Sequence, residues 1–207
     1  MTQQTRRARQ RAQLRQEILD TAREMLVREG FEHLSLRKVA ERIGYSPTAM
    51  YLHFDDKRDL VYHVCQDTFG RLVQELTPLE SEFKDPSVRL RAAMRRYIEF
   101  GLRHPQHYLA ALVAVPPELL PDDVAKYNDP DSPGMRFFAL LRGAVVSAMD
   151  GRRIRKVDPD VTTRALWAAV HGVTSMLIQL PHFLWGDQRA VVDNLLDSLI
   201  DGLRPRR

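Results

Sequence analysis

Residues 35–54 read SLRKVAERIGYSPTAMYLHF, and this stretch decides the fold of the first part of the chain. Ser35 is a residue type that caps helices, and apolar residues recur behind it at helical spacing: Leu36, Val39, Ala40 and Ile43. Gly44 suits the open backbone of a turn, and a second helix is expected from Ser46 to about Phe54. Two short helices joined by a tight turn have the spacing of a helix-turn-helix.

The same helical periodicity extends in both directions from this stretch. It predicts a helix that ends at Gly30, a helix that starts behind Asp55-Asp56 and ends before Pro78, and further helices over residues 87–103, 105–115, 133–150, 159–180 and 187–203. The Pro- and Asp-rich segment from Pro116 to Pro133 is expected to be a solvated loop. Because no convincing strand pattern is present, the sequence predicts an all-α protein.

Charge is unevenly distributed along the 207 residues. Lys and Arg number 31 against 27 Asp and Glu, which gives a formal net charge of +4. Residues 1–15 contain no acidic residue and several arginines: Arg6, Arg7, Arg9, Arg11 and Arg15. A basic end on a nearly neutral body indicates that a polyanion is met at one place. We expect this segment to be either an arm that enters the DNA minor groove or a disordered solubilising tail.

Composition excludes several classes of protein. Cys65 is the sole cysteine, so the sequence predicts neither a disulfide framework nor a cysteine-based zinc site. Residues 1–15 are too polar for a signal peptide, and polar residues interrupt the most apolar stretch, Ala165 to Leu180. We therefore expect a soluble cytoplasmic protein that makes no membrane contact.

The residues do not assemble into a catalytic or cofactor site. The glycines form no phosphate-binding loop, and neither a paired acid and base nor an activated nucleophile is recognisable. A metal site needs three or four convergent ligands, and the histidines of the C-terminal part lack that spacing: His104, His107, His171 and His182. The sequence thus predicts a protein that is not an enzyme and that uses neither a metal nor another cofactor.

Residues 18–62 resemble the DNA-binding domain of the TetR/AcrR family of transcriptional regulators. The matching features are Ala22-Arg23-Glu24, Gly30-Phe31, Ser35-Leu36-Arg37, Val39-Ala40, Gly44, Ser46-Pro47, Tyr51, His53-Phe54, Lys57 and Leu60. The resemblance implies double-stranded DNA as a partner and a second, all-helical domain in which a small ligand binds and two subunits meet. Trp167 with His171-Gly172 is similar to a feature of one C-terminal subfamily.

The resemblance also implies which residues contact DNA: Ser35, Arg37, Ser46, Pro47, Thr48, Ala49, Tyr51, Leu52, His53 and Lys57. Tyr51 either bonds a phosphate through its hydroxyl or is a core aromatic. His53 either reaches DNA or packs beneath the recognition helix, and Lys57 either faces phosphate or is solvated. The family often has Gly-Thr-Leu where this chain has Thr48-Ala49-Met50, and Leu52 permits only apolar contact, for example with a thymine methyl. The base sequence that is read therefore stays open.

Candidates for a ligand pocket are helical residues with apolar bodies: Phe100, Tyr108, Met135, Phe138, Trp167, His171 and Met176. Each of them, taken alone, is more often plain core than ligand contact. Trp167 and His171 lie one helical turn apart and share a face. There they either orient a ligand or satisfy each other.

We expect a basic arm over residues 1–15, a helix-turn-helix DNA-binding domain over 16–56, and a ligand-binding and dimerisation domain over 57–207. The resemblance implies a homodimeric repressor that binds a palindromic operator and is released by a small-molecule effector of unknown identity. The helices over 159–180 and 187–203 would pair with their symmetry mates as a four-helix bundle. Alternatives stay open: a ligand-independent DNA-binding dimer, an activator, or a small enzyme with an incidental helix-turn-helix.

Overall fold

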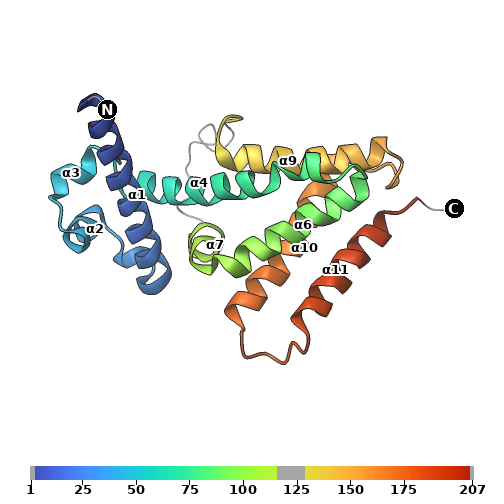
Figure 1. Cartoon of the computed structure of the whole chain (residues 1–207). Helices are drawn as coiled ribbons and strands as arrows, with labels where there is room; N and C mark the ends of the chain where they lie inside the picture. The colour runs from blue at the N-terminus through green and yellow to red at the C-terminus, as the bar shows by residue number, and fades with distance from the viewer. Residues whose placement is uncertain (1–2, 116–128, 206–207) are drawn as a thin grey trace. The chain divides into compact units, whose positions relative to one another are not determined.

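The computed structural model of the chain describes residues 3–115 and 129–205, which form an all-α fold (Figure 1). The elements are α1 (Gln3–Glu29), the 3-10 helix η1 (Phe31–His33), α2 (Leu36–Ile43), α3 (Pro47–Tyr51), α4 (Lys57–Leu76), α5 (Leu79–Glu82), α6 (Pro86–Arg103), α7 (Pro105–Leu112), α9 (Pro133–Asp150), α10 (Pro159–Gln179) and α11 (Gln188–Leu203). No strand occurs within the described ranges, and the all-α prediction is confirmed. Most of the loop predicted from Pro116 to Pro133 lies outside the described residues.

The helix boundaries follow the predicted pattern with a few differences. Helix α1 starts at Gln3, so the arginine-rich segment is helical although it carries no apolar stripe. Helix α3 stops at Tyr51 rather than Phe54, because the N–H groups of His53 and Phe54 both bond to the carbonyl of Met50 in a turn. The sequence does not predict α5, which is too short to show an apolar period.

Side-chain caps set the starts of the later helices. The residue before each of α6, α9, α10 and α11 accepts a hydrogen bond from a backbone N–H of the first turn: Asp85, Ser132, Asp158 and Asp187. Proline follows the cap in α6, α9 and α10, where its fixed φ is pre-organised for the helix. These signals are visible in the sequence, which explains why these starts are predicted closely.

The described chain divides into two compact units. The first contains the residues up to Thr68 and the segment that starts at Gln106. The second contains Phe69–Pro105 and the described chain from Asp129 onward. The boundary between Thr68 and Phe69 falls inside α4, so one helix belongs to both units.

In the first unit, α1, α2, α3, α7 and the start of α4 contribute to one hydrophobic core. Its larger members include Ile18, Leu19, Met25, Leu26, Leu34, Met50, Phe54, Leu60 and Val64. Arg23 of α1 is only 3% exposed, and its Nη2 lies 2.7 Å from Oδ2 of Asp67 in α4. This buried ion pair fixes α1 to α4.

In the second unit, α6 packs against α9, α10 and α11 (Figure 1). Fully buried aromatic side chains fill the space between these helices: Tyr97, Phe100 and Phe137. Arg91 and Arg95 of α6 both form ion pairs with Asp193 of α11. The unit therefore combines an aromatic core with charged contacts at its edge.

Candidate functional site

Hydroxyl caps and one glycine shape the helix-turn-helix in the first unit. The Ser35 Oγ accepts a hydrogen bond from the Lys38 N–H at 3.2 Å and starts α2. Gly44 ends α2 with a φ of 73°, a left-handed conformation that favours glycine. The Ser46 Oγ then accepts from the Ala49 N–H at 3.3 Å and starts α3. The turn between α2 and α3 is thus determined by local sequence.

Burial orients α3, the predicted recognition helix. Met50 and Phe54 are buried in the core beside Leu36 and Val39, and Ile43 packs against that core. One face of α3 is therefore held against α2 by apolar contacts. The opposite face is left to solvent.

The exposed face of α3 and its flanking residues carry five of the ten residues expected to contact DNA. Ser46, Pro47, Thr48, Tyr51 and Leu52 are all exposed. Tyr51 is 60% exposed and Leu52 is 69% exposed, so Tyr51 is not a core aromatic. Large hydrophobic side chains this exposed on a short helix are a feature of binding surfaces.

The remaining expected DNA contacts lie at the edges of this face. Ser35, Ala49, His53 and Lys57 are half-buried, whereas Arg37 is exposed. The His53 ring lies 6.3 Å from the Phe54 ring, and partial burial together with the nearby charges of Arg11 and Arg15 lowers the pKa of His53. His53 is therefore mainly neutral at pH 7 and offers hydrogen bonds rather than charge.

Lys57 and Arg37 each have a partner within the unit. The Lys57 Nζ lies 3.5 Å from the centroid of the Phe31 ring, and burial lowers the pKa of this lysine. Arg37 Nε pairs with Glu41 Oε1 at 3.1 Å, with both side chains exposed. An exposed pair of this kind contributes about 0–1 kcal/mol, so Arg37 can exchange its partner for a phosphate at little cost.

Two arginines of α1 lie at the end of α3. Arg11 Nη2 donates to the Leu52 carbonyl at 3.3 Å, and the Arg15 guanidinium lies 5.1 Å from the centroid of the Phe54 ring. Sequence reasoning placed both within the basic arm but missed these contacts. Their spacing of four residues indicates that they share one face of a helix, but it does not indicate which residues that face contacts.

In the second unit, Trp167 and His171 are linked through a third residue. Trp167 Nε1 donates to the Tyr97 hydroxyl at 3.2 Å, and this hydroxyl lies 3.4 Å from Nδ1 of His171. Tyr97 is fully buried, and partial burial lowers the pKa of His171. The sequence did not identify Tyr97, because a buried tyrosine on an apolar face has the pattern of ordinary core.

The other candidate ligand residues do not gather around this group. Tyr108 is fully buried in the first unit, and Phe100 is fully buried in the second. Met135 and Phe138 are half-buried, and the Arg164 guanidinium lies 5.6 Å from the Phe138 ring centroid. Met176 is half-exposed at 47%. The cavity that Trp167 and Tyr97 line holds only about 10 Å³, so side chains nearly fill it.

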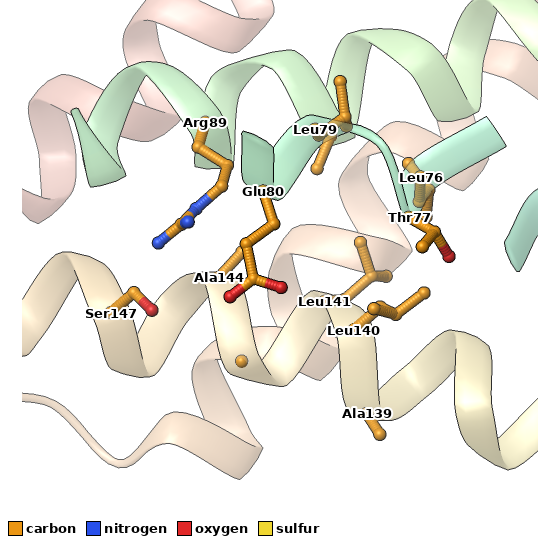
Figure 2. Close-up of a pocket in the computed structure, with 12 residues that line it drawn as sticks. Leu76, Thr77, Leu79, Glu80, Arg89, Ala139, Leu140, Leu141, Ala144 and Ser147 are labelled. Atoms are coloured by element: carbon orange, nitrogen blue, oxygen red, sulfur yellow. The ribbon is translucent and has the colours of Figure 1, made fainter. Parts of the chain in front are cut away.

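A larger cavity of about 160 Å³ lies elsewhere in the second unit (Figure 2). It is lined by the end of α4, by α5, by α6 and by α9, and by none of the expected ligand residues. The space exists because small residues face it: Ala93 from α6, and Gly143 and Ala144 from α9. Periodicity does not reveal such a cavity, because it arises where large side chains are lacking.

Two family models match the chain. Residues 18–64 match bacterial regulatory proteins of the tetR family, and residues 90–203 match the tetracyclin repressor-like C-terminal domain. The chain belongs to the TetR family. The first match covers the helix-turn-helix, and the second covers most of α6 together with α9, α10 and α11 of the second unit.

The individual proteins that the chain resembles are distant in sequence. The HTH-type transcriptional regulator SAR2658 of Staphylococcus aureus (strain MRSA252) is 24% identical over 90 residues, which are 44% of this chain and 49% of that protein. The chain thus spans about half the length of the curated relatives it matches. A tetR-family bacterial regulatory protein from Rhodococcus RHA1 has a TM-score of 0.71 at 14% identity, covering 93% of this chain and 98% of that one. The regulator FadR from Bacillus subtilis in complex with stearoyl-CoA has a TM-score of 0.75 at 14% identity, covering 91% and 99%. These structures support the fold.

Two further observations concern the described residues only. No helix among them is both long and apolar enough to cross a membrane. No group of three or more His, Cys, Asp or Glu side chains among them is placed to hold a metal ion.

Proposed function

We propose that this TetR-family protein is a one-component transcriptional repressor that binds double-stranded DNA as a homodimer and is released by a small ligand. The observation that carries the proposal is the division of α3 into a buried face and an exposed face. Met50 and Phe54 anchor the helix, whereas Thr48, Tyr51 and Leu52 are presented to solvent. A short helix held in this way fits the DNA major groove.

The exposed residues of α3 have chemistry suited to distinct DNA contacts. The Tyr51 hydroxyl donates to a phosphate and sets the position of the helix on the duplex. Thr48 reaches a base edge or a phosphate, and Leu52 packs against a thymine methyl. Specific contact is thus concentrated in a few side chains, as expected for a helix-turn-helix.

Residues around α3 add contacts to the sugar–phosphate backbone. Ser35 and Arg37 at the start of α2, and Lys57 at the start of α4, border the exposed face. The arginines of residues 1–15 extend the cationic surface, and Arg11 is held at the end of α3 by its bond to the Leu52 carbonyl. In this proposal residues 1–56 together with Lys57 bind DNA, with affinity that falls as salt rises.

The second unit, within residues 57–207, supplies the dimer interface in this proposal. Helix α10 and its C-cap residue expose a stripe of small and apolar residues at helical spacing: Val161, Ala165, Ala168, Met176 and Leu180. An exposed stripe of this kind on a helix is suited to packing against its own symmetry mate. We infer that α10 and α11 form a four-helix bundle with the partner subunit. The two-fold axis then requires a roughly palindromic operator.

Ligand release requires a difference in ligand affinity between two forms of the protein. The ligand must bind more tightly to the form that does not fit DNA than to the form that fits DNA. A coupling free energy of about 1–3 kcal/mol changes operator affinity by roughly 5- to 150-fold. Helix α4 belongs to both compact units and is the element through which such a change passes. The FadR structure with stearoyl-CoA shares this fold, which supports a ligand-binding role for the second unit.

A ligand-independent DNA-binding dimer is the second candidate function. It is favoured by the cavity beside Trp167, which side chains nearly fill. In that case the second unit only dimerises, and no small molecule changes operator affinity.

The test is fluorescence-anisotropy binding to the DNA immediately upstream of the gene, with scrambled DNA of equal length as control. We expect tight, salt-dependent binding to the upstream DNA, weakened about tenfold in Tyr51→Phe, which loses one charge-assisted hydrogen bond. Arg11→Ala should weaken binding and reduce its salt dependence, whereas Lys156→Ala, which removes an exposed cation of the second unit, should do neither. If upstream and scrambled DNA bind equally weakly, binding sites are selected from a pool of random DNA sequences. If that selection also finds no preferred site, the proposed regulator is ruled out.

A further inference from the structure

The 160 Å³ cavity of the second unit is lined by apolar residues and by charged ones. Leu76, Leu79, Leu140 and Leu141 form the walls, and Ala93, Gly143 and Ala144 leave the space between them. Cavities that take drug-sized ligands are usually about 300–1,000 Å³. The cavity is therefore suited to a small molecule with a compact apolar body.

Two side chains of opposite charge line the same cavity. Arg89 comes from α6 and Glu80 from α5, and Figure 2 shows both side chains directed toward α9. Within the described part of the chain neither forms an ion pair or a side-chain hydrogen bond, although Arg91 and Arg96 on the same helix do. Arg89 is half-buried and Glu80 is exposed.

The pattern of charges restricts the ligand class. A carboxylate would bond the Arg89 guanidinium well, but a simple anion would leave Glu80 facing a like charge. An ammonium group would pair with Glu80, but a simple cation would leave Arg89 unpaired and repelled. A molecule that carries both charges satisfies both side chains, and the hydroxyl of Ser147 in the cavity lining adds a hydrogen-bonding group.

We propose that this cavity binds an aliphatic α-amino acid, with its carboxylate on Arg89, its ammonium on Glu80 and its side chain against the leucine walls. The inference rests on the proposed function only in naming this molecule as the effector. The occupant would contact the end of α4 and would therefore favour one position of that helix over another.

The test is isothermal titration calorimetry of the full chain without DNA. L-leucine, L-isoleucine, L-valine and L-methionine are titrated first, followed by isocaproate and isoamylamine, which keep the apolar body of leucine but lack its ammonium or its carboxylate. We expect at least one amino acid to bind, and each leucine analogue to bind about tenfold more weakly than leucine, because each loses a charged hydrogen-bond partner.

Variants assign the two charges. Arg89→Gln should remove the preference for leucine over isoamylamine, and Glu80→Gln should remove the preference for leucine over isocaproate. The controls Arg136→Gln and Glu99→Gln change exposed residues of α9 and α6 that do not line the cavity, and both should keep the wild-type preferences. Thermal unfolding of every variant verifies that the fold is retained.

The inference is overturned if none of the four amino acids binds. It is also overturned if all probes bind equally, or if the Arg89 and Glu80 variants behave as their controls. Operator binding is measured separately, so that the two proposals can fail independently. Amino-acid binding without operator binding would leave the cavity assigned and refute the regulator, and the reverse result would refute only the cavity assignment.

Discussion

Replacing Arg23 should destabilise the protein more than replacing any exposed arginine. Its side chain is buried between α1 and α4, with Nη2 2.7 Å from Asp67 Oδ2 and Nη1 bonded to Asp20. Arg23→Ala removes a positively charged partner of Asp67, whose side chain is only 18% exposed. Breaking a buried pair in this way costs about 3–5 kcal/mol, a large part of the roughly 5–15 kcal/mol that stabilises a native protein.

Matched variants separate the contributions to this loss. Asp20 is 54% exposed, so Asp20→Ala should cost no more than about 1 kcal/mol. Arg23→Met keeps most of the side-chain volume, so it should retain the packing part of the stability but not the electrostatic part. The free energy of unfolding is measured by guanidinium titration followed by circular dichroism, with equal slopes required for comparison. If Arg23→Ala cost as little as Asp20→Ala, the Arg23–Asp67 pair would not fix α1 to α4.

Further predictions concern buried polar groups. Tyr97→Phe should cost about 1–3 kcal/mol, because the Trp167 N–H loses its acceptor; unchanged unfolding would contradict this. Burial lowers the pKa of His171 below about 6.5, so the unfolded state binds the proton more readily. Stability should therefore fall as pH decreases through about 6.5. In unfolding measured at several pH values, His171→Gln should reduce this pH dependence of stability. The dependence that remains comes from His53, whose pKa is also lowered. Burial raises the pKa of the Cys65 thiol to about 12, so iodoacetamide should label it only after denaturation, as mass spectrometry would show.

Most of the fold could be predicted from the sequence because its helices carry their own start and stop signals. Ser35, Ser46 and Asp85 cap helices in the structure as their residue types suggest, and Gly44 adopts the left-handed turn. The start of α1 at Gln3 could not be predicted, because its first turns are polar on every side and lack an apolar period. Where a helix is not held by a buried stripe, periodicity gives no signal.

The sequence predicted the exposed face of α3 but not the cavity of the second unit. For α3, the helical geometry that buries Met50 also predicts that Thr48 and Tyr51 face outward. The cavity is different, because aromatic residues such as Phe100 are used for packing, and space appears where small residues of different helices meet. Which residues meet across helices depends on tertiary packing. The periodicity of a single sequence does not identify those contacts.

The core of the first unit includes Ala110 and Ala111 of α7, which are far in sequence from the helix-turn-helix they help to cover. A chimaera that exchanges the first unit between two such proteins therefore cannot be made with a single junction in the sequence. A transplanted segment that ended before Thr68 would lack part of α4, and it would also lack the surface of α7. A chimaera that folds must include both the chain up to Thr68 and the segment that contains α7, or must have one of these segments mutated to fit the other. The helix-turn-helix and α7 thus belong to one folding unit that two separate stretches of the sequence encode.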